Sequence, residues 1–85
     1  MIARTVKQGD IVRHFKHTED GEPNNYMYKI IAVGKYVENE KPCVVYQALY
    51  GKGEIWVREA KEFLSEVDRE KYPNATQKYR FEVII

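Results

Sequence analysis

Two runs rich in β-branched and aromatic residues flank a short glycine-containing segment in the middle of the chain. Both runs lie within Val44–Arg58, and Gly51-Lys52-Gly53 separates them. Glycine reaches the positive φ values that tight turns require, and the residue types on either side are typical of strands. The pattern predicts a β-hairpin around which the rest of the chain is organised.

Two strands are predicted before this hairpin. The first is Ile11–Lys16, which follows a turn at Gly9-Asp10, and the second is Tyr26–Tyr36, which is largely apolar on both alternating faces in its middle. Residues 17–25 are all polar or turn-forming and predict a loop. The charged segment 37–42 predicts a turn into the hairpin, so we expect a meander of at least three antiparallel strands.

After the hairpin the apolar residues change their spacing. Ala60, Phe63, Leu64 and Val67 follow the period of one helix face, which predicts a helix from Glu59 to about Val67. The last segment, Tyr79–Ile84, alternates again and predicts a closing strand. Its inward residues are expected to be Tyr79, Phe81 and Val83.

Composition limits the classes of protein to consider. Eighty-five residues with 44% apolar side chains predict one globular domain over residues 1–85. Fourteen basic and thirteen acidic residues leave a net charge of +1. This balance disfavours nucleic-acid binding that depends mainly on phosphate neutralisation, although it leaves room for a local basic patch.

Cysteine usage and the ends of the chain point to the interior of a cell. Cys43 is the only cysteine, lies among apolar neighbours and is expected in the core, so no intrachain disulfide and no multi-cysteine zinc site can form. The first residues lack the apolar region of a signal peptide, and no run has the length of a membrane span. We expect a cytoplasmic protein with no membrane association.

Several separated segments together resemble one known family. They are Arg13-His14-Phe15-Lys16, Val44–Gly51, Trp56-Val57-Arg58 with Phe63, Asp68–Pro73 and Gln77–Glu82. In this order they are similar to the small bacterial family of unknown function called DUF1653, over nearly the whole chain from Gly9. The resemblance implies a mainly β domain, a small antiparallel SH3-like barrel with one short helix or helical turn. It makes a turn over Ala60–Phe63 followed by a strand over Leu64–Val67 as acceptable as the longer helix, and it implies no activity.

Polar and aromatic residues within the strand-like runs form the candidate binding site. A barrel could bring these side chains together at one end. There arginine offers paired N–H donors, glutamine offers both a hydrogen-bond donor and an acceptor, and aromatic side chains stack on the rings of a ligand. In the alternative interpretation the polar residues face outward and the aromatic rings belong to the core. The candidates are His14, Lys16, Tyr46, Gln47, Tyr50, Trp56 and Arg58.

Three functions remain open on this basis. The first is a binding module for a small molecule or a protein partner, as a monomer or weak dimer, and the residues favour it. The second is a single-stranded nucleic-acid-binding module, with Tyr50 and Trp56 stacking on bases. The third is a small enzyme using His14, although no nucleophile or carboxylate stands in a recognisable arrangement with it. No cofactor is expected, and His14 and His17 have poor spacing for a metal site.

Overall fold

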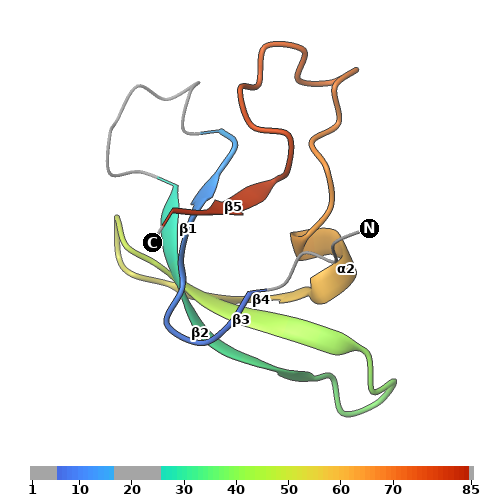
Figure 1. The fold of residues 1–85 in the computed structure, drawn as a ribbon. Helices are drawn as coiled ribbons and strands as arrows, with labels where there is room; N and C mark the ends of the chain where they lie inside the picture. Colours follow the sequence, from blue (N-terminus) through green and yellow to red (C-terminus); the bar gives the residue numbers. More distant parts are fainter. Residues whose placement is uncertain (1–5, 17–25, 85) are drawn as a thin grey trace.

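The computed structural model describes residues 6–16 and 26–84, and in this part of the chain a five-stranded antiparallel sheet forms the frame (Figure 1). The strands are β1 (Ile11–His14), β2 (Met27–Lys35), β3 (Pro42–Ala48), β4 (Ile55–Glu59) and β5 (Phe81–Val83). Their order in the sheet is β4-β3-β2-β1-β5. The predicted meander is confirmed, and β5 returns to pair with β1 at the far edge. The predicted loop over residues 17–25 lies outside the described residues.

The central hairpin forms where the glycines predict it. Gly51 and Gly53 have φ values of 59° and 67°, a region that glycine occupies without the strain of a side chain. The Ala48 N–H donates to the Glu54 carbonyl at 2.9 Å and closes the turn end of the β3–β4 ladder. The Gln47 side chain adds a hydrogen bond from its Nε2 to the Gly53 carbonyl at 3.0 Å.

A β-bulge interrupts the middle of β2, where both faces of the run are apolar in sequence. The register with β3 shifts between Ile30 and Ala32, so Ile31 is an extra residue on β2. Ile30 is fully buried, whereas the following residues from Ala32 onward are exposed. This distal part of the β2–β3 hairpin projects from the body of the protein at the lower right of Figure 1.

The core lies on the inner face of the curled sheet. Phe63 fills its centre with no exposed surface, and its ring stacks on that of Phe81 at 4.1 Å between centroids. Phe81 is therefore inward as predicted, while Tyr79 is only half-buried and Val83 is 46% exposed, so the expected inward position of Val83 is wrong. The buried members of this cluster are Val12, Tyr28, Ile30, Val44, Tyr46, Ala48, Phe63 and Phe81.

The helix after β4 is shorter than its apolar spacing predicts. It is α2 (Ala60–Phe63), a single turn, so the expected helix to Val67 is wrong and the alternative turn over Ala60–Phe63 is confirmed. The chain leaves the helix because Ser65 and Val67 bond to a distant segment. The Arg80 N–H donates to the Ser65 carbonyl at 3.0 Å, and the Val67 N–H donates to the Lys78 carbonyl at 2.9 Å.

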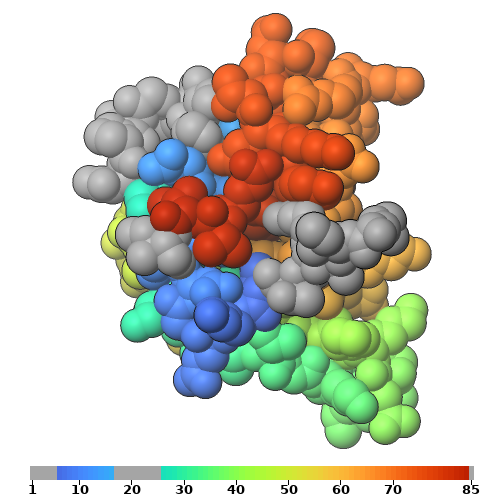
Figure 2. All heavy atoms as spheres, viewed as in Figure 1, coloured from blue at the N-terminus to red at the C-terminus, as the bar shows by residue number. Residues whose placement is uncertain are grey.

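The alternative strand over Leu64–Val67 is reduced to one isolated bridge between Glu66 and Tyr79. Figure 2 shows the C-terminal segment, orange to red, on the upper part of this face, beside β1 and above the green β2–β3 hairpin. A second small apolar cluster, made by Phe15, Val67 and Ala75 with Tyr72 against it, anchors that segment.

The sheet is curled but not closed, because the pairings of the described residues leave β4 and β5 as its two edges. A mainly β fold with one short helix is thus established, whereas the SH3-like barrel is not. Helix α2 lies at the open side of the curl and contacts β3 and β4 (Figure 1). None of the helical structure described has the length and apolar character needed to cross a membrane.

Candidate functional site

Basic side chains from four separate places in the chain converge on one cavity, which we call the basic pocket. Its volume is about 270 Å³, and it opens to solvent. Four permanent cations and one carboxylate give it a local charge of about +3 with His14 neutral, on a chain whose net charge is +1. The lining residues are His14, Phe15, Lys16, Arg58, Asp68, Lys71, Tyr72 and Arg80.

The curl of the sheet brings these segments together. Arg58 lies on edge strand β4, whereas His14 ends β1 and Arg80 precedes the opposite edge strand β5. In a flat sheet three strands would separate β4 from β5. Phe63 and Phe81, stacked in the curl, bridge the two sides and allow side chains from both to line the same cavity.

A tight turn at Asp68 presents Lys71, a pocket cation that lies between α2 and β5 in the chain. The Asp68 carboxylate accepts hydrogen bonds from the backbone N–H groups of Glu70 and Lys71, at 3.0 and 3.3 Å, as aspartate commonly does in turns. The guanidinium of Arg69 then holds the following loop by donating to the carbonyls of Ala75 and Gln77. These bonds fix the backbone that carries Lys71 and Tyr72.

The Tyr72 ring forms the aromatic wall of the pocket. It packs edge-on against Phe15 with 4.8 Å between centroids. The Nζ atoms of Lys16 and Lys71 lie 5.4 and 5.6 Å from its centroid, within the range of cation–π attraction. The ring therefore attracts both ammonium groups and offsets part of the repulsion between them.

His14 is held by both its ring and its Nδ1 atom. The ring lies 4.5 Å from Phe15 and 4.8 Å from Phe81, centroid to centroid. Its Nδ1 accepts the backbone N–H of Lys16 at 3.2 Å. His14 thus orders the chain at the end of β1, and this order sets the position from which Lys16 reaches the pocket.

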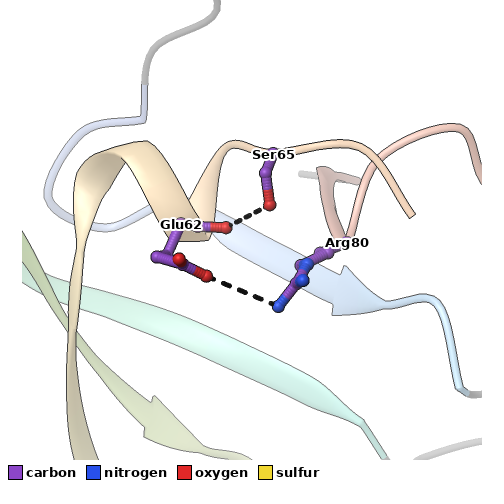
Figure 3. A network of polar contacts seen from close by, with 3 residues as sticks. All are labelled: Glu62, Ser65 and Arg80. Carbon is purple, nitrogen blue, oxygen red and sulfur yellow. Dashed lines mark hydrogen bonds and ion pairs between the residues drawn. The ribbon is translucent and has the colours of Figure 1, made fainter. Parts of the chain in front are cut away.

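Arg80 has a charged partner beside the pocket. Its Nη1 lies 3.7 Å from Oε2 of Glu62 on α2, and the Ser65 hydroxyl donates to the Glu62 carbonyl at 2.6 Å (Figure 3). The Glu62 side chain is 59% exposed and that of Arg80 is 33% exposed, so water screens this pair and it contributes little to stability. Arg80 thus lines the basic pocket while its guanidinium stays beside the Glu62 carboxylate.

The structure brings together three of the seven residues predicted for the site. His14, Lys16 and Arg58 line the basic pocket. Tyr46 is 5% exposed and belongs to the core, where its ring contacts Tyr28, Phe63 and Phe81. Gln47 pairs with Lys29 on the other face of the sheet and bonds to the hairpin turn.

The remaining two predicted residues, Tyr50 and Trp56, share a separate hollow of about 110 Å³ with Lys52 and Glu54. Trp56 is 49% exposed. The Tyr50 hydroxyl lies 2.6 Å from that of Tyr28. Burial, with the hydrogen bond to Tyr50, raises the pKa of Tyr28 well above its usual range, so the Tyr28 hydroxyl keeps its proton under ordinary conditions.

Sequence reasoning missed the pocket residues of the C-terminal segment, Asp68, Lys71, Tyr72 and Arg80. They lie in a polar run without regular alternation, and periodicity carries no information about where such a run folds back. The one available signal was that the same run takes part in the family resemblance, which marked it as more than a connecting loop.

Across residues 6–16 and 26–84, no group of three or more histidine, cysteine, aspartate or glutamate side chains is arranged to hold a metal ion. Cys43 is buried as predicted, and its thiol lies 3.6 Å from the Lys41 carbonyl.

Comparison with known proteins gives one match. The family model described as "Protein of unknown function (DUF1653)" matches residues 10–83. Neither the curated proteins nor the solved structures contain a significant match to the chain.

Proposed function

The chain belongs to the DUF1653 family of unknown function, since the match spans residues 10–83, and we propose that it is a small binding module whose basic pocket holds an anionic ligand. The observation that carries this proposal is the gathering of Lys16, Arg58, Lys71 and Arg80 around one cavity. Like charges repel, so collecting them on a chain with balanced charge costs free energy unless an anion compensates them.

The chemistry of the pocket suits a small anion. Arginine offers planar pairs of N–H donors that match a phosphate or carboxylate, and lysine adds a mobile charge. A volume of about 270 Å³ is near the lower limit of small-molecule pockets, which run from roughly 300 to 1,000 Å³. We therefore propose that the pocket takes a phosphate or carboxylate group of a small ligand.

The proposal includes the architecture. We propose that the curled sheet is an open variant of the small SH3-like barrel, in which α2 and the segment leading to β5 occupy the gap between the edge strands. The stacked rings of Phe63 and Phe81 support this arrangement, because they connect the helix to the far edge of the sheet.

Binding can be tested by NMR titration of the isotopically labelled chain with inorganic phosphate and pyrophosphate, in dilute buffer with sodium chloride as the ionic-strength control. Saturable shifts are expected at the amides of residues 14–16, 71–72 and 80. Arg58→Gln and Arg80→Gln should each weaken pyrophosphate binding by about tenfold, because each removes a charge-assisted hydrogen bond.

Lys35→Gln provides the matched control. It removes the same charge from the exposed end of β2, outside the pocket, and should change the affinity less than about twofold through long-range electrostatics alone. Equal weakening by all three substitutions, or shifts that chloride reproduces, would show a general charge effect and contradict the proposal.

A second candidate function has its own observation. Trp56 is half-exposed beside Tyr50 and Lys52, an arrangement that suits stacking on the bases of a single strand. In that case a short single-stranded oligonucleotide quenches Trp56 fluorescence saturably, and Trp56→Ala abolishes its binding while leaving pyrophosphate binding intact. The alternative of a small enzyme using His14 stays an untested prediction.

A further inference from the structure

Among residues 6–16 and 26–84, strand β4 is an edge strand, and no described strand pairs with its outer side. The Ala48 N–H donates to the Glu54 carbonyl, so residues 48 and 54 form a hydrogen-bonded pair of the β3–β4 ladder. The register continues without a break, and hydrogen-bonded pairs alternate along an antiparallel ladder. The backbones of Trp56 and Arg58 therefore bond to β3, whereas the N–H and C=O groups of Ile55 and Val57 point away from the sheet.

The side chains of this edge are exposed and apolar. Ile55 is 58% exposed, Trp56 49% and Val57 63%. Proteins usually protect a free edge with lysine, proline, a bulge or a covering segment, because it is a template for another strand. Residues 55–57 of β4 contain no lysine, no proline and no bulge. Their side chains are about half exposed or more, so no described segment covers them.

We propose that β4 pairs antiparallel with β4 of a second copy of this chain, about a two-fold axis that passes at Trp56. In this register Ile55 of each copy faces Val57 of the other, and the two residues exchange both backbone hydrogen bonds. The two Trp56 side chains lie opposite each other as a closely spaced pair. The five-stranded sheets of the two copies then form one continuous sheet.

Charge complementarity selects this register and the second copy as the occupant. Glu54 and Arg58 flank Trp56 symmetrically, and their partners Ala48 and Val44 in β3 place both side chains on the inner face. Pairing about Trp56 sets Glu54 of each copy opposite Arg58 of the other, twice in the dimer.

The two neighbouring registers that use the same outward backbone groups lack this match. Moving the axis to Val57 sets Ile55 opposite Glu59, and moving it to Ile55 sets Glu54 opposite Trp56. Each therefore places a carboxylate against an apolar side chain. Only a strand with an acid and a base at equal distances from its centre complements itself in this way.

Hydrogen exchange provides the direct test, because the proposal names the amides that change. The exchange of the Ile55 and Val57 amides should slow as the protein concentration rises from micromolar to millimolar, while sedimentation velocity shows a dimer over the same series. The amides of Trp56 and Arg58, which bond to β3 in either state, are the internal control. The pairing uses one five-residue strand from each copy, so we expect it to bury less than a standard interface of about 1,600 Å² and to give a weak dimer.

Charge reversal tests the register. Glu54→Lys sets like charges opposite each other at both ends of the pairing and should weaken the dimer about tenfold or more. The double variant Glu54→Lys with Arg58→Glu reverses both charges and should restore it. Ile55→Lys places an exposed charge on the edge strand and should also disrupt the dimer, with an unchanged unfolding curve showing that the chain still folds.

Two outcomes would overturn the inference. One is a monomer at every concentration, which includes the case in which the edge takes an extended peptide from a different protein. The other is a dimer that ignores Glu54→Lys and leaves exchange at Ile55 and Val57 unchanged. Arg58 also lines the basic pocket, but the two proposals are tested separately: Glu54 lies outside the pocket, and the dimer is measured without added phosphate or pyrophosphate.

Discussion

Replacing Phe63 by alanine should remove a large part of the free energy of unfolding. Phe63 has no exposed surface, and removal of a buried phenylalanine side chain costs about 3 to 5 kcal/mol. A chain of 85 residues has a total stability of about 4 to 13 kcal/mol. The loss is therefore between roughly a quarter of the total and all of it, although the residue belongs to a single turn of helix.

If the alanine variant fails to fold, the free energy of unfolding can be measured on the conservative variant Phe63→Leu. Leucine retains most of the apolar area but loses the parallel stacking on Phe81 and the edge contact with Tyr46, whose centroids lie 4.1 and 5.1 Å from that of Phe63. Aromatic pairs contribute about 0.5 to 1.5 kcal/mol beyond their buried area, so we expect a cost of about 1 to 2 kcal/mol.

Urea unfolding followed by Trp56 fluorescence and by far-ultraviolet circular dichroism measures these values. The two signals should coincide, since a domain of this size unfolds as one unit, and the slope with urea should stay unchanged. A double-mutant cycle with Phe81→Leu should return a coupling of about 0.5 to 1.5 kcal/mol between the two rings.

Val37→Ala is the control, because Val37 is 86% exposed in the β2–β3 turn and its replacement should cost less than about 0.5 kcal/mol. A cost of Phe63→Ala below about 1 kcal/mol, together with zero coupling to Phe81, would refute the reasoning. It would mean that α2 does not fill the curl of the sheet, and the account of how the basic pocket forms would fail with it.

Two further predictions concern hydrogen bonds. The folded protein holds the Tyr28 proton more tightly than the unfolded chain does, so the contribution of Tyr28 to stability is complete below about pH 10 and decreases as the pH rises above that value. The unfolding midpoint should therefore fall less steeply above pH 10 in Tyr28→Phe than in the unchanged protein. Equal slopes in the two proteins would contradict this prediction. Arg69→Lys should weaken pyrophosphate binding several-fold, although Arg69 does not line the pocket. Lysine cannot donate simultaneously to the Ala75 and Gln77 carbonyls, and these two hydrogen bonds position the loop after Lys71 and Tyr72. An unchanged affinity in the same NMR titration would show that the loop keeps its position without the two hydrogen bonds from Arg69.

The helix after β4 shows where periodicity stops being informative. Ala60, Phe63, Leu64 and Val67 have helical spacing, yet only Ala60–Phe63 form a helix. The backbone groups of Ser65 and Val67 find partners near Lys78 and Arg80, which are more than ten residues away in sequence. The spacing of apolar residues over a few turns cannot predict such hydrogen bonds, because the residues that accept or donate them lie outside the segment whose spacing is considered.

The candidate site divides in the same way. His14, Lys16 and Arg58 were identified as polar residues within strand-like runs, and they share the basic pocket. Tyr46 and Gln47 lie in the same run of β3, but successive residues of a strand point to opposite faces, and the burial of each depends on what covers that face. Tyr46 meets Phe63 and Phe81, so it is core rather than ligand-binding surface.

By itself the sequence determined the strands, the order of the meander, the glycine turn between β3 and β4, and the burial of Phe81 and Cys43. Each of these features depends on contacts between residues close in the chain or on the intrinsic preference of one residue type. Only the tertiary structure decided the length of α2, the open sheet, and the meeting of Arg58 with Lys71 and Arg80. These depend on how far the sheet curls around Phe63, a property of packing between segments distant in sequence. The physical reason is that side-chain alternation encodes which face of a strand is buried, whereas the curvature that brings two edges together arises only when the whole core is filled.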